Sequence, residues 1–500
     1  MDDEPGPSVS GEHRQERKDG EKSGAANTLG MAFLANNSSK LGATITTQPQ
    51  TNRSPNGRDG GCCPDCCICC AQCDPGDLME CLGYICCCGA LFGTDANKYN
   101  FAERRFLLYD VNPGEGFNLR RDVYTRVANA VRQLRERGLD FVLVLPPWGN
   151  IWHWRRKKRT KIRWSELFDM DSLAKFVPVM EFDEFMDAHG DFVETVLYLQ
   201  NYAEGWPEDG EYVLKYDLRP CIEADKYYIK RGHKWHGHFF DYAERFHAMD
   251  MKCLSIQGQS STLATAVTNL FPKGRSLMVD RAEVILHDQF GDFFFWQARK
   301  SMRYAKGLRS LGDAFRAVQF GNASEYLGAH LRRADFVWAH QMEIPSVEGA
   351  AAQVGQIASR LGVRDVFLST DATASEVETF THRLAEQNIR TVTFAGVGED
   401  ENLSEAAISI IDQWVCANAR QVPHFRSPQI LNSSVRFFIG THLSTFSFRI
   451  HEDREILGLD PETTFNRFCP DGVLDCEQPA KWTIVHQGDP PDLPHPDIVS

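Results

Sequence analysis

The sequence predicts an α/β protein built from two Rossmann-like β/α domains in series, with a nucleotide cleft between them. Short apolar runs alternate with amphipathic segments from Arg104 onward, which is typical of parallel sheets covered by helices. The alternation occurs twice, in residues 97–325 and 326–486. Polar or glycine-rich segments follow several of the strands, where open α/β sheets bind their ligands. Neither half contains G-x-G-x-x-G or G-x-x-x-x-G-K-[ST], so ordinary dinucleotide binding and P-loop chemistry have no support.

Length and charge narrow the functional classes. The chain has 500 residues, enough for two or three domains. With 54 Lys+Arg against 68 Asp+Glu, its net charge of -14 argues against nucleic acid as a partner. No apolar stretch is long enough to span a bilayer, and the first residues are polar and charged. We therefore expect neither a transmembrane segment nor a signal peptide in this chain.

The ends of the chain differ in composition from its body. Residues 1–60 are predicted to be a disordered tail, and residues 487–500 a second tail. Residues 61–96 hold eleven of the 16 cysteines, and the spacing Cys66-x-x-Cys69 is compatible with zinc. A lipidated or oxidised low-complexity segment and a gene-model artefact are the alternatives. The other five cysteines suit one or two disulfides and a buried thiol, as in an oxidising compartment.

The first domain opens with a predicted β-α-β unit. Residues 106–109 and 141–145 are apolar runs suited to buried parallel strands. Between them, apolar residues recur at helical spacing, with Asn118 as the expected N-cap and Gly138 as the expected stop.

The second domain repeats the alternation. Its predicted strands are 326–331, 366–369, 391–394 and 436–439, and its predicted helices are 346–362, 376–387 and 408–417.

The turn at residues 112–118 is the first candidate for chemistry. It joins a strand to a helix N-terminus, whose N–H groups and dipole can face a pyrophosphate. Glu115 lies between two glycines, which allow a ligand to approach the backbone closely. It is interpreted either as an exposed surface acid or as a general base directed into a cleft.

Two further clusters follow strands of the second domain. In the first, Arg332 and Arg333 follow a strand; one is expected to face a diphosphate, and the other to form an ion pair with Asp335 or another carboxylate. The second is the hydroxyl-rich turn at Ser444, which precedes a predicted helix and suits phosphate oxygens. Such a turn is common, so it is weak evidence by itself.

Three lesser signals have structural explanations. Asp169-x-Asp171 matches a metal-binding D-x-D pattern, but a turn or helix cap is favoured. The basic run 155–161 is interpreted as a solvated loop, or as a guide for an acidic acceptor. The tryptophans around it are interpreted as core, or as the edge of an acceptor groove: Trp148, Trp152, Trp154 and Trp164.

Taken in order, the motifs resemble the GDP-fucose protein O-fucosyltransferases that modify thrombospondin type 1 repeats. The resemblance runs from about Arg104 to Thr483. It rests on Asp110-Val-Asn-Pro-Gly-Glu-Gly-Phe-Asn-Leu-Arg-Arg121, Leu145-Pro-Pro-Trp-Gly149, His330-Leu-Arg-Arg333, Ile411-Asp-Gln-Trp414 and Ser444-Thr-Phe-Ser-Phe-Arg449. It implies a GT-B-like fold and inverting transfer of L-fucose from GDP-β-L-fucose to Ser or Thr of folded repeats, in the endoplasmic reticulum lumen. It implies no metal ion and no cofactor beyond the donor.

The resemblance also implies roles for individual residues. Glu115 corresponds to the catalytic base, Arg332 to the arginine that stabilises the leaving β-phosphate, and Asp412 to the reader of guanine or ribose. The rest of the GDP-fucose site corresponds to Gly114, Gly116, Phe117, Asn118, His330, Leu331, Ser444, Thr445 and Phe446. Cys221 with Cys253, and Cys469 with Cys476, correspond to disulfides.

Four features depart from the family pattern. Gly114 replaces a usual proline, and Asp453 replaces a glutamate tied to activity. Residues 421–435 look like a loop insertion or unspliced intron, and the expected signal peptide is missing. Two alternative functions follow: a related fucosyltransferase with another acceptor, such as EGF-like repeats or a glycan, or a catalytically inactive binding protein.

Overall fold

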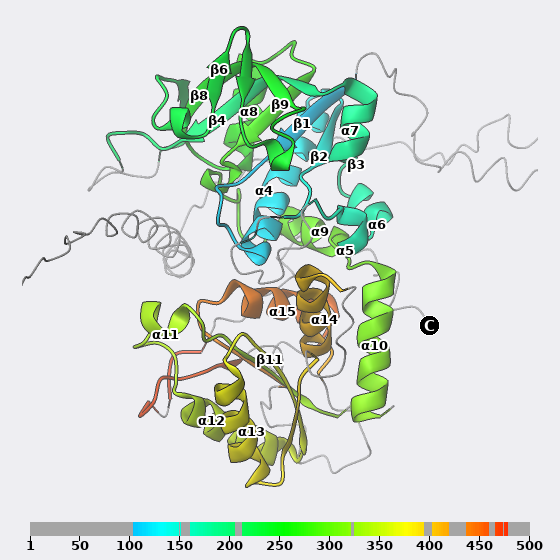
Figure 1. Cartoon of the computed structure of the whole chain (residues 1–500), viewed down its shortest axis with the longest axis vertical. Helices are drawn as coiled ribbons and strands as arrows, with labels where there is room; N and C mark the ends of the chain where they lie inside the picture. Colours follow the sequence, from blue (N-terminus) through cyan, green and yellow to red (C-terminus); the bar gives the residue numbers. More distant parts are fainter. Residues whose placement is uncertain are drawn as a thin grey trace, which may run out of the picture. The chain divides into compact units, whose positions relative to one another are not determined.

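Two mainly parallel sheets covered by helices form the part of the chain that the computed structural model describes (Figure 1). That part comprises residues 104–149, 151, 161–205, 213–321, 325–394, 403–419, 437–459, 466–473 and 475–478. It belongs to one unit that runs from Asn100 to Ser500. Several predictions lie outside these residues: both tails, the Cys-rich segment with its zinc spacing, the segment 421–435, Trp152, Trp154 and most of the basic run.

The first sheet has the described strand order β3-β2-β1-β9-β4-β8-β7-β6, with β5 also paired to β8. Pairing is parallel from β3 to β8, whereas β5, β6 and β7 pair antiparallel. The strands are β1 (Arg105–Tyr109), β2 (Phe141–Leu145), β3 (Val179–Glu181), β4 (Phe192–Gln200), β5 (Lys215–Leu218), β6 (Ile229–Arg231), β7 (Lys234–His236), β8 (His247–Gln257) and β9 (Ser276–Asp280).

Helices cover both faces of this sheet. The α-helices are α4 (Phe117–Glu136), α5 (Trp164–Leu167), α6 (Met170–Ala174), α7 (Phe182–His189), α8 (Ser260–Leu270), α9 (Phe293–Ser301) and α10 (Lys306–Phe320), and the 3₁₀ turns are η1 (Ala224–Lys226), η2 (Phe239–Asp241) and η3 (Ala282–Val284). Leu107 and Tyr109 of β1 belong to the core that α4 and α8 share, while Phe106 and Leu108 pack with residues of α7. This division explains why a strand buried on both faces has a continuous apolar sequence.

The second sheet is parallel throughout, in the order β12-β11-β10-β13-β14. Its elements are β10 (Leu327–Leu331), α11 (Phe336–Ala339), α12 (Val347–Leu361), β11 (Asp365–Thr370), α13 (Ala374–Ala385), β12 (Arg390–Val392), α14 (Glu405–Ala417), β13 (Phe438–Gly440), α15 (Thr445–Ile456) and β14 (Asn466–Arg467). All the strands and helices predicted in this half are present, with ends shifted by a few residues. α10, which precedes β10, packs against α14.

The ends of two helices test the capping predictions. Ser346 caps α12 by accepting a hydrogen bond from the N–H of Gly349, and Gly362 ends the helix in the left-handed region, as predicted. For α4, the N-cap is Gly116 and not Asn118, so that prediction was wrong by two residues. Asn118 lies inside the first turn, where its side chain accepts hydrogen bonds from the side chains of Gln413 and Arg121 and does not cap the backbone of the helix.

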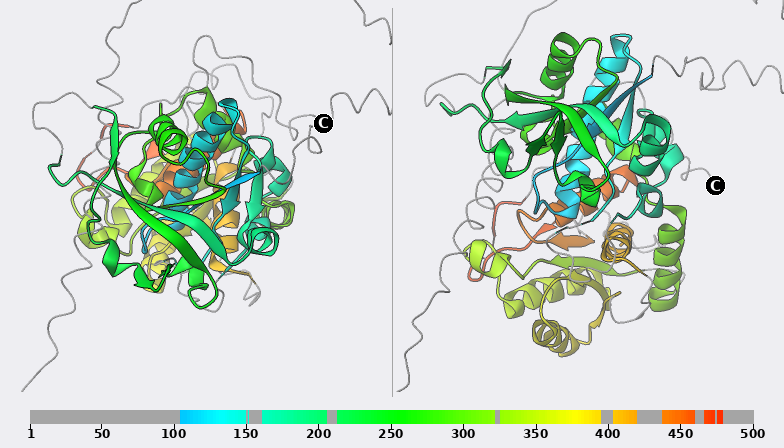
Figure 2. Two further views of the ribbon diagram at one scale, coloured as in Figure 1. Left: turned by 90° about the horizontal axis from the view of Figure 1, so that it is seen from above. Right: turned by 45° about the horizontal axis from the view of Figure 1, so that its top comes forward.

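Helices from the two halves meet between the sheets. Figures 1 and 2 show α4 and α9 of the first half beside α14 and α15 of the second. Buried ion pairs cross this boundary: Arg449 of α15 lies 3.2 Å from Asp122 of α4, and Arg299 of α9 binds Glu452 of α15. The carboxyl end of β1 therefore leads into a helix that contacts the second domain directly.

Candidate active site

The loop between β1 and α4 is shaped by a glycine. The N–H of Glu115 donates to the carbonyl of Asn112 at 3.2 Å, closing a turn with Pro113 and Gly114 in its centre. Gly114 has a φ of +101°, a conformation that proline cannot adopt because its ring holds φ near -65°. A proline at this position would therefore require a different backbone conformation just before Glu115.

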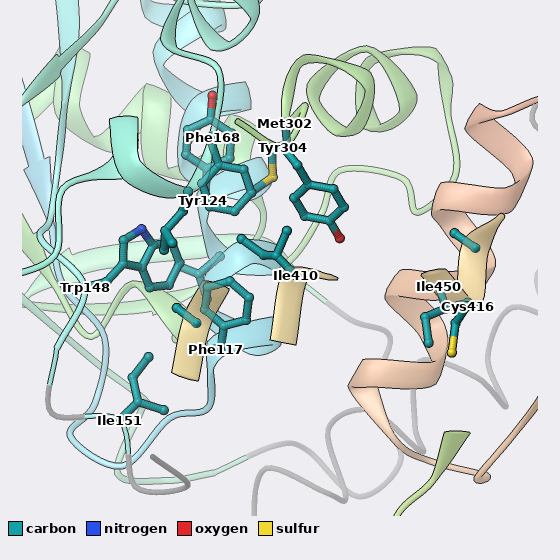
Figure 3. Packing of buried hydrophobic residues seen from close by; sticks show 14 of the residues in the cluster. Phe117, Tyr124, Trp148, Ile151, Phe168, Met302, Tyr304, Ile410, Cys416 and Ile450 are labelled. Carbon is teal, nitrogen blue, oxygen red and sulfur yellow. The ribbon is translucent and has the colours of Figure 1, made fainter. Parts of the chain in front are cut away.

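Glu115 is buried, which excludes the exposed surface acid. Its relative exposure is 8%, and its carbonyl accepts a hydrogen bond from Arg120 Nε at 3.1 Å. The next apolar residue, Phe117, packs against Trp148 with a ring separation of 4.9 Å (Figure 3). Trp148 in turn contacts Trp164 at 4.7 Å, and both indoles are buried. The core interpretation is thus confirmed for these two tryptophans, which form part of the support beneath the loop.

A cluster of acidic side chains lies where β1 ends and the same loop begins. Asp110 follows β1 and Asp280 is the last residue of the paired strand β9, and Glu283 accepts a hydrogen bond from the N–H of Asn112 at 3.0 Å. Burial, followed by the charge of Asp280, raises the pKa of Asp110 to about 7. Burial likewise raises the pKa of Asp280 and of Glu283. A small pocket beside the cluster is lined by Asp110, Arg120, Pro146 and Trp148, among others.

The end of β10 is cationic, and both of its arginines are paired. Arg332 binds Asp335 at 2.5 Å and also Asp371. Arg333 binds Glu376 at 2.9 Å and the carbonyl of Pro345 at 3.0 Å. The structural ion pair predicted for one arginine is thus present for both, and a diphosphate at Arg332 would compete with two carboxylates.

His330 serves as a neutral support in this cluster. Burial and the nearby charge of Arg332 lower its pKa to about 3. Its Nδ1 lies 2.8 Å from the Ser447 hydroxyl, and its ring stacks on Phe446 with centroids 4.4 Å apart. Leu331, the last residue of β10, is buried. The strand therefore holds Phe446 in place through His330.

The predicted helix after the hydroxyl-rich turn is α15, which begins at Thr445 with Ser444 as its N-cap. The Ser444 side chain makes no capping hydrogen bond to the helix. Thr441 connects this turn to β10, because its hydroxyl accepts from the N–H of Arg332 at 2.8 Å. The amino end of a 12-residue helix therefore lies next to the arginine cluster.

Asp412 on α14 has an incompletely satisfied carboxylate. The Ser369 hydroxyl donates to its Oδ2 at 2.9 Å, whereas its buried Oδ1 accepts no hydrogen bond from the described part of the chain. Burial raises the pKa of this carboxyl to about 7. An acceptor of this kind is costly when left without a donor, so it suits a ligand that brings N–H or O–H groups.

Asp453 makes two side-chain contacts, one through each carboxylate oxygen. One oxygen accepts from Arg299 at 3.0 Å, and the other lies 2.8 Å from the Tyr304 hydroxyl. Asp169 caps α6 through the N–H of Ser172, which confirms the helix-cap interpretation. Within the described ranges, no group of His, Cys, Asp and Glu side chains is arranged to hold a metal ion.

Both disulfides implied by the resemblance are present, Cys221–Cys253 and Cys469–Cys476, and Cys416 is a buried free thiol. Among the helices that the structure describes, none has both the length and the apolar character needed to cross a membrane.

Several residues around the site carried no assigned role in the sequence reasoning. Asp110, Arg121 and Gln413 lie inside motifs that the resemblance rests on, so their positions were visible but their partners were not. Asp280 and Tyr304 had no local signal. Their proximity to the site depends on strand pairing and helix contacts between segments far apart in the sequence.

Solved structures identify the class of fold. A crystal structure of POFUT1 in complex with GDP-fucose matches with a TM-score of 0.50 at 14% identity, covering 75% of this chain and 99% of that one. Together with the two mainly parallel sheets and their facing helices, this match shows that the chain has a GT-B-like fold.

Sequence comparison then gives the family. Residues 106–457 match the family model described as GDP-fucose protein O-fucosyltransferase. GDP-fucose protein O-fucosyltransferase 2 of Caenorhabditis elegans is 41% identical over 420 residues, covering 79% of this chain and 93% of that protein. The protein of the same name from Homo sapiens is 42% identical over 413 residues, covering 77% and 91%. The chain belongs to the GDP-fucose protein O-fucosyltransferase family.

Proposed function

We propose that this protein transfers L-fucose from GDP-β-L-fucose, with inversion, to a Ser or Thr hydroxyl of folded thrombospondin type 1 repeats. The observation that carries the proposal is the buried Glu115, three residues before an asparagine that bonds to the helix bearing Asp412. This connection ties the loop of the proposed base to the proposed nucleotide-binding half. The acceptor class comes from the motif resemblance, and the names of the relatives support protein O-fucosylation.

In this mechanism the acceptor oxygen attacks the anomeric carbon of fucose from the side opposite to GDP. The new carbon–oxygen bond forms as the bond to the β-phosphate breaks, and Glu115 receives the hydroxyl proton directly or through a water molecule. Arg332 and the amino end of α15, with Ser444 and Thr445, stabilise the negative charge that collects on the diphosphate. These groups supply the positive charge, so the scheme requires no metal ion and no further cofactor.

The nucleoside and the compartment complete the proposal. Asp412 Oδ1 would accept hydrogen bonds from guanine or ribose, and Gly114, Gly116, Phe117, Asn118 and Phe446 would line the donor site. We propose the endoplasmic reticulum lumen as the location, because disulfides such as Cys221–Cys253 persist in oxidising compartments.

The test is an acceptor panel. The full chain is incubated with GDP-fucose and one acceptor at a time: a folded thrombospondin type 1 repeat, an EGF-like repeat or a glycan. The mass of each product is measured by mass spectrometry. A one-fucose mass increase on the thrombospondin repeat alone is expected. An increase only on another acceptor would indicate the related fucosyltransferase, and no GDP binding at all would indicate an inactive protein.

A further inference from the structure

A single buried carboxamide, that of Gln413, connects the two domains next to the site. Gln413 has no exposed surface. Its Nε2 donates to Asn118 Oδ1 at 2.9 Å, and its Oε1 accepts from Arg121 Nη1 at 2.6 Å. The Tyr304 hydroxyl lies 2.8 Å from the same Oε1. A glutamine is suited to this position because it both donates to α4 and accepts from it.

Both ends of this connection lead to proposed functional residues. Asn118 lies in the first turn of α4, three residues after Glu115. The Oδ1 of Asn118 also accepts a hydrogen bond from Arg121 Nη1 at 3.3 Å. On the other side, Asp412 immediately precedes Gln413 on α14 and bonds to Ser369 of β11. Any shift of α14 relative to α4 would therefore change the distance between the base loop and the nucleotide reader.

Tyr304 extends the same connection to α15. Its hydroxyl lies 2.8 Å from Gln413 Oε1 and 2.8 Å from Asp453 Oδ2, and Asp453 also accepts from Arg299. Burial raises the pKa of Tyr304, so its hydroxyl keeps the proton that it shares between these acceptors. The side chains of Gln413, Tyr304 and Asp453 thus find hydrogen-bond partners in one arrangement of the two halves, which favours that arrangement over others.

We propose that Gln413 is a positioning residue that holds the Glu115 loop at a fixed place relative to the nucleotide-binding helix α14. The proposal rests on the function proposed above and adds a residue that touches neither substrate. Misplacing a reacting group by about 1 Å can lower turnover by roughly a hundredfold. Loss of the Gln413–Asn118 hydrogen bond should accordingly lower turnover more than donor binding.

The test uses Gln413→Glu in the full chain. This variant keeps the size of the side chain and the acceptor for Arg121, but it cannot donate to Asn118. We expect kcat to fall about tenfold or more and the Kd for GDP to rise by a smaller factor, because the shifted loop carries the proposed base but supplies only part of the donor site. Hydrogen–deuterium exchange of residues 110–118 in the GDP-bound protein should increase.

The matched control is Gln353→Glu. Gln353 also both donates and accepts: its Nε2 donates to the carbonyl of Cys469 at 2.9 Å, and its Oε1 accepts from the N–H of Cys469 at 2.8 Å. Unlike Gln413, it connects two segments of the same half of the molecule. It should leave kcat and the exchange of residues 110–118 unchanged. If Gln413→Glu does not fold, judged by its melting temperature and GDP binding, Gln413→Met replaces it as a neutral side chain of similar length.

Four outcomes are decisive. Unchanged exchange of residues 110–118 in the Gln413 variant overturns the proposal, and so does an equal increase in the Gln353 control, which would indicate general loosening. An equal loss of kcat and GDP affinity would assign Gln413 to donor binding instead. If the wild-type protein transfers no fucose, the proposed function fails, while the exchange measurement still decides whether Gln413 holds the loop.

Discussion

The carboxyl ends of β1 and β10 occupy equivalent places in the two sheets but differ in their charged side chains, because only the end of β10 carries arginines paired with carboxylates. Each strand lies inside its sheet, β1 between β2 and β9, and β10 between β11 and β13. The end of β1 gathers Asp110, Asp280 and the loop of Glu115, whereas the end of β10 carries Arg332 and Arg333. The same backbone arrangement can therefore serve proton transfer on one side and diphosphate binding on the other, and the side chains decide which.

The two ends also differ in how their charges are satisfied. The arginines are paired with carboxylates, so their charges are compensated in the structure. The acids at β1 repel one another and are desolvated, which raises the pKa of Asp110 to about 7. A region that keeps its acids partly protonated suits proton transfer, and one that keeps its cations ordered suits an anionic leaving group.

The largest effect should come from Glu115→Gln, which removes the proposed base and keeps the size of the side chain. We expect kcat to fall by a factor of about 10²–10⁴, because no carboxylate at this position can receive the proton of the acceptor hydroxyl. Steady-state transfer to a folded repeat measures this loss. A variant that retains most of its turnover would remove Glu115 from the mechanism.

Arg332→Ala should have the next largest effect. Loss of one group that stabilises a developing anion typically costs about 10²–10³ in turnover. The matched control is Arg333→Ala, which breaks the ion pair with Glu376 and should leave turnover far less affected. If the two variants lose the same activity, Arg332 has no special place at the diphosphate.

The affinity for GDP should depend on the protonation of Asp412. Its pKa of about 7 in the unbound protein means that acidification protonates the acceptor proposed for guanine or ribose. The affinity should therefore weaken as pH falls below about 7, by up to roughly tenfold per pH unit. Calorimetry from pH 5 to pH 8 measures this, with Asp412→Asn as the control that cannot titrate. If the GDP affinities of the wild-type protein and of Asp412→Asn change with pH in the same way, the assignment of Asp412 as the acceptor for guanine or ribose is contradicted.

The smallest effect is on the thermal stability of the protein, through Asp110 at the carboxyl end of β1. The pKa of Asp110 is raised from 3.8 to about 7 in the folded protein, so between these values the folded state binds more protons than the unfolded state. Ionisation of Asp110 thus destabilises the fold as pH rises. Asp110→Asn should raise the melting temperature by roughly 2 °C or more at pH 8 and less at pH 5. Asp225→Asn, at an exposed carboxylate, should show no such difference.

Local pattern was sufficient for much of the fold but not for the contacts at the site. Apolar runs located β1, β2 and the strands β10 to β13 of the second sheet but not β14, and turn chemistry located the loop of Glu115. Asn118 was misassigned because its side chain accepts two buried hydrogen bonds, one from Gln413 of the other half and one from Arg121 of its own helix, in place of a capping bond. The proximity of Asp110 to Asp280, and the bridge through Gln413, depend on tertiary pairing that no local window contains.

The difference between the two strand ends is tested most directly by GDP binding to Glu115→Gln and Arg332→Ala, measured by calorimetry beside the wild-type protein. We expect Glu115→Gln to bind GDP within about twofold of wild type, because the base acts on the acceptor proton. Arg332→Ala should bind GDP about tenfold more weakly or worse, because it loses a charge-assisted contact to the diphosphate. Equal loss of affinity in both variants, or no loss in either, would contradict the division of roles.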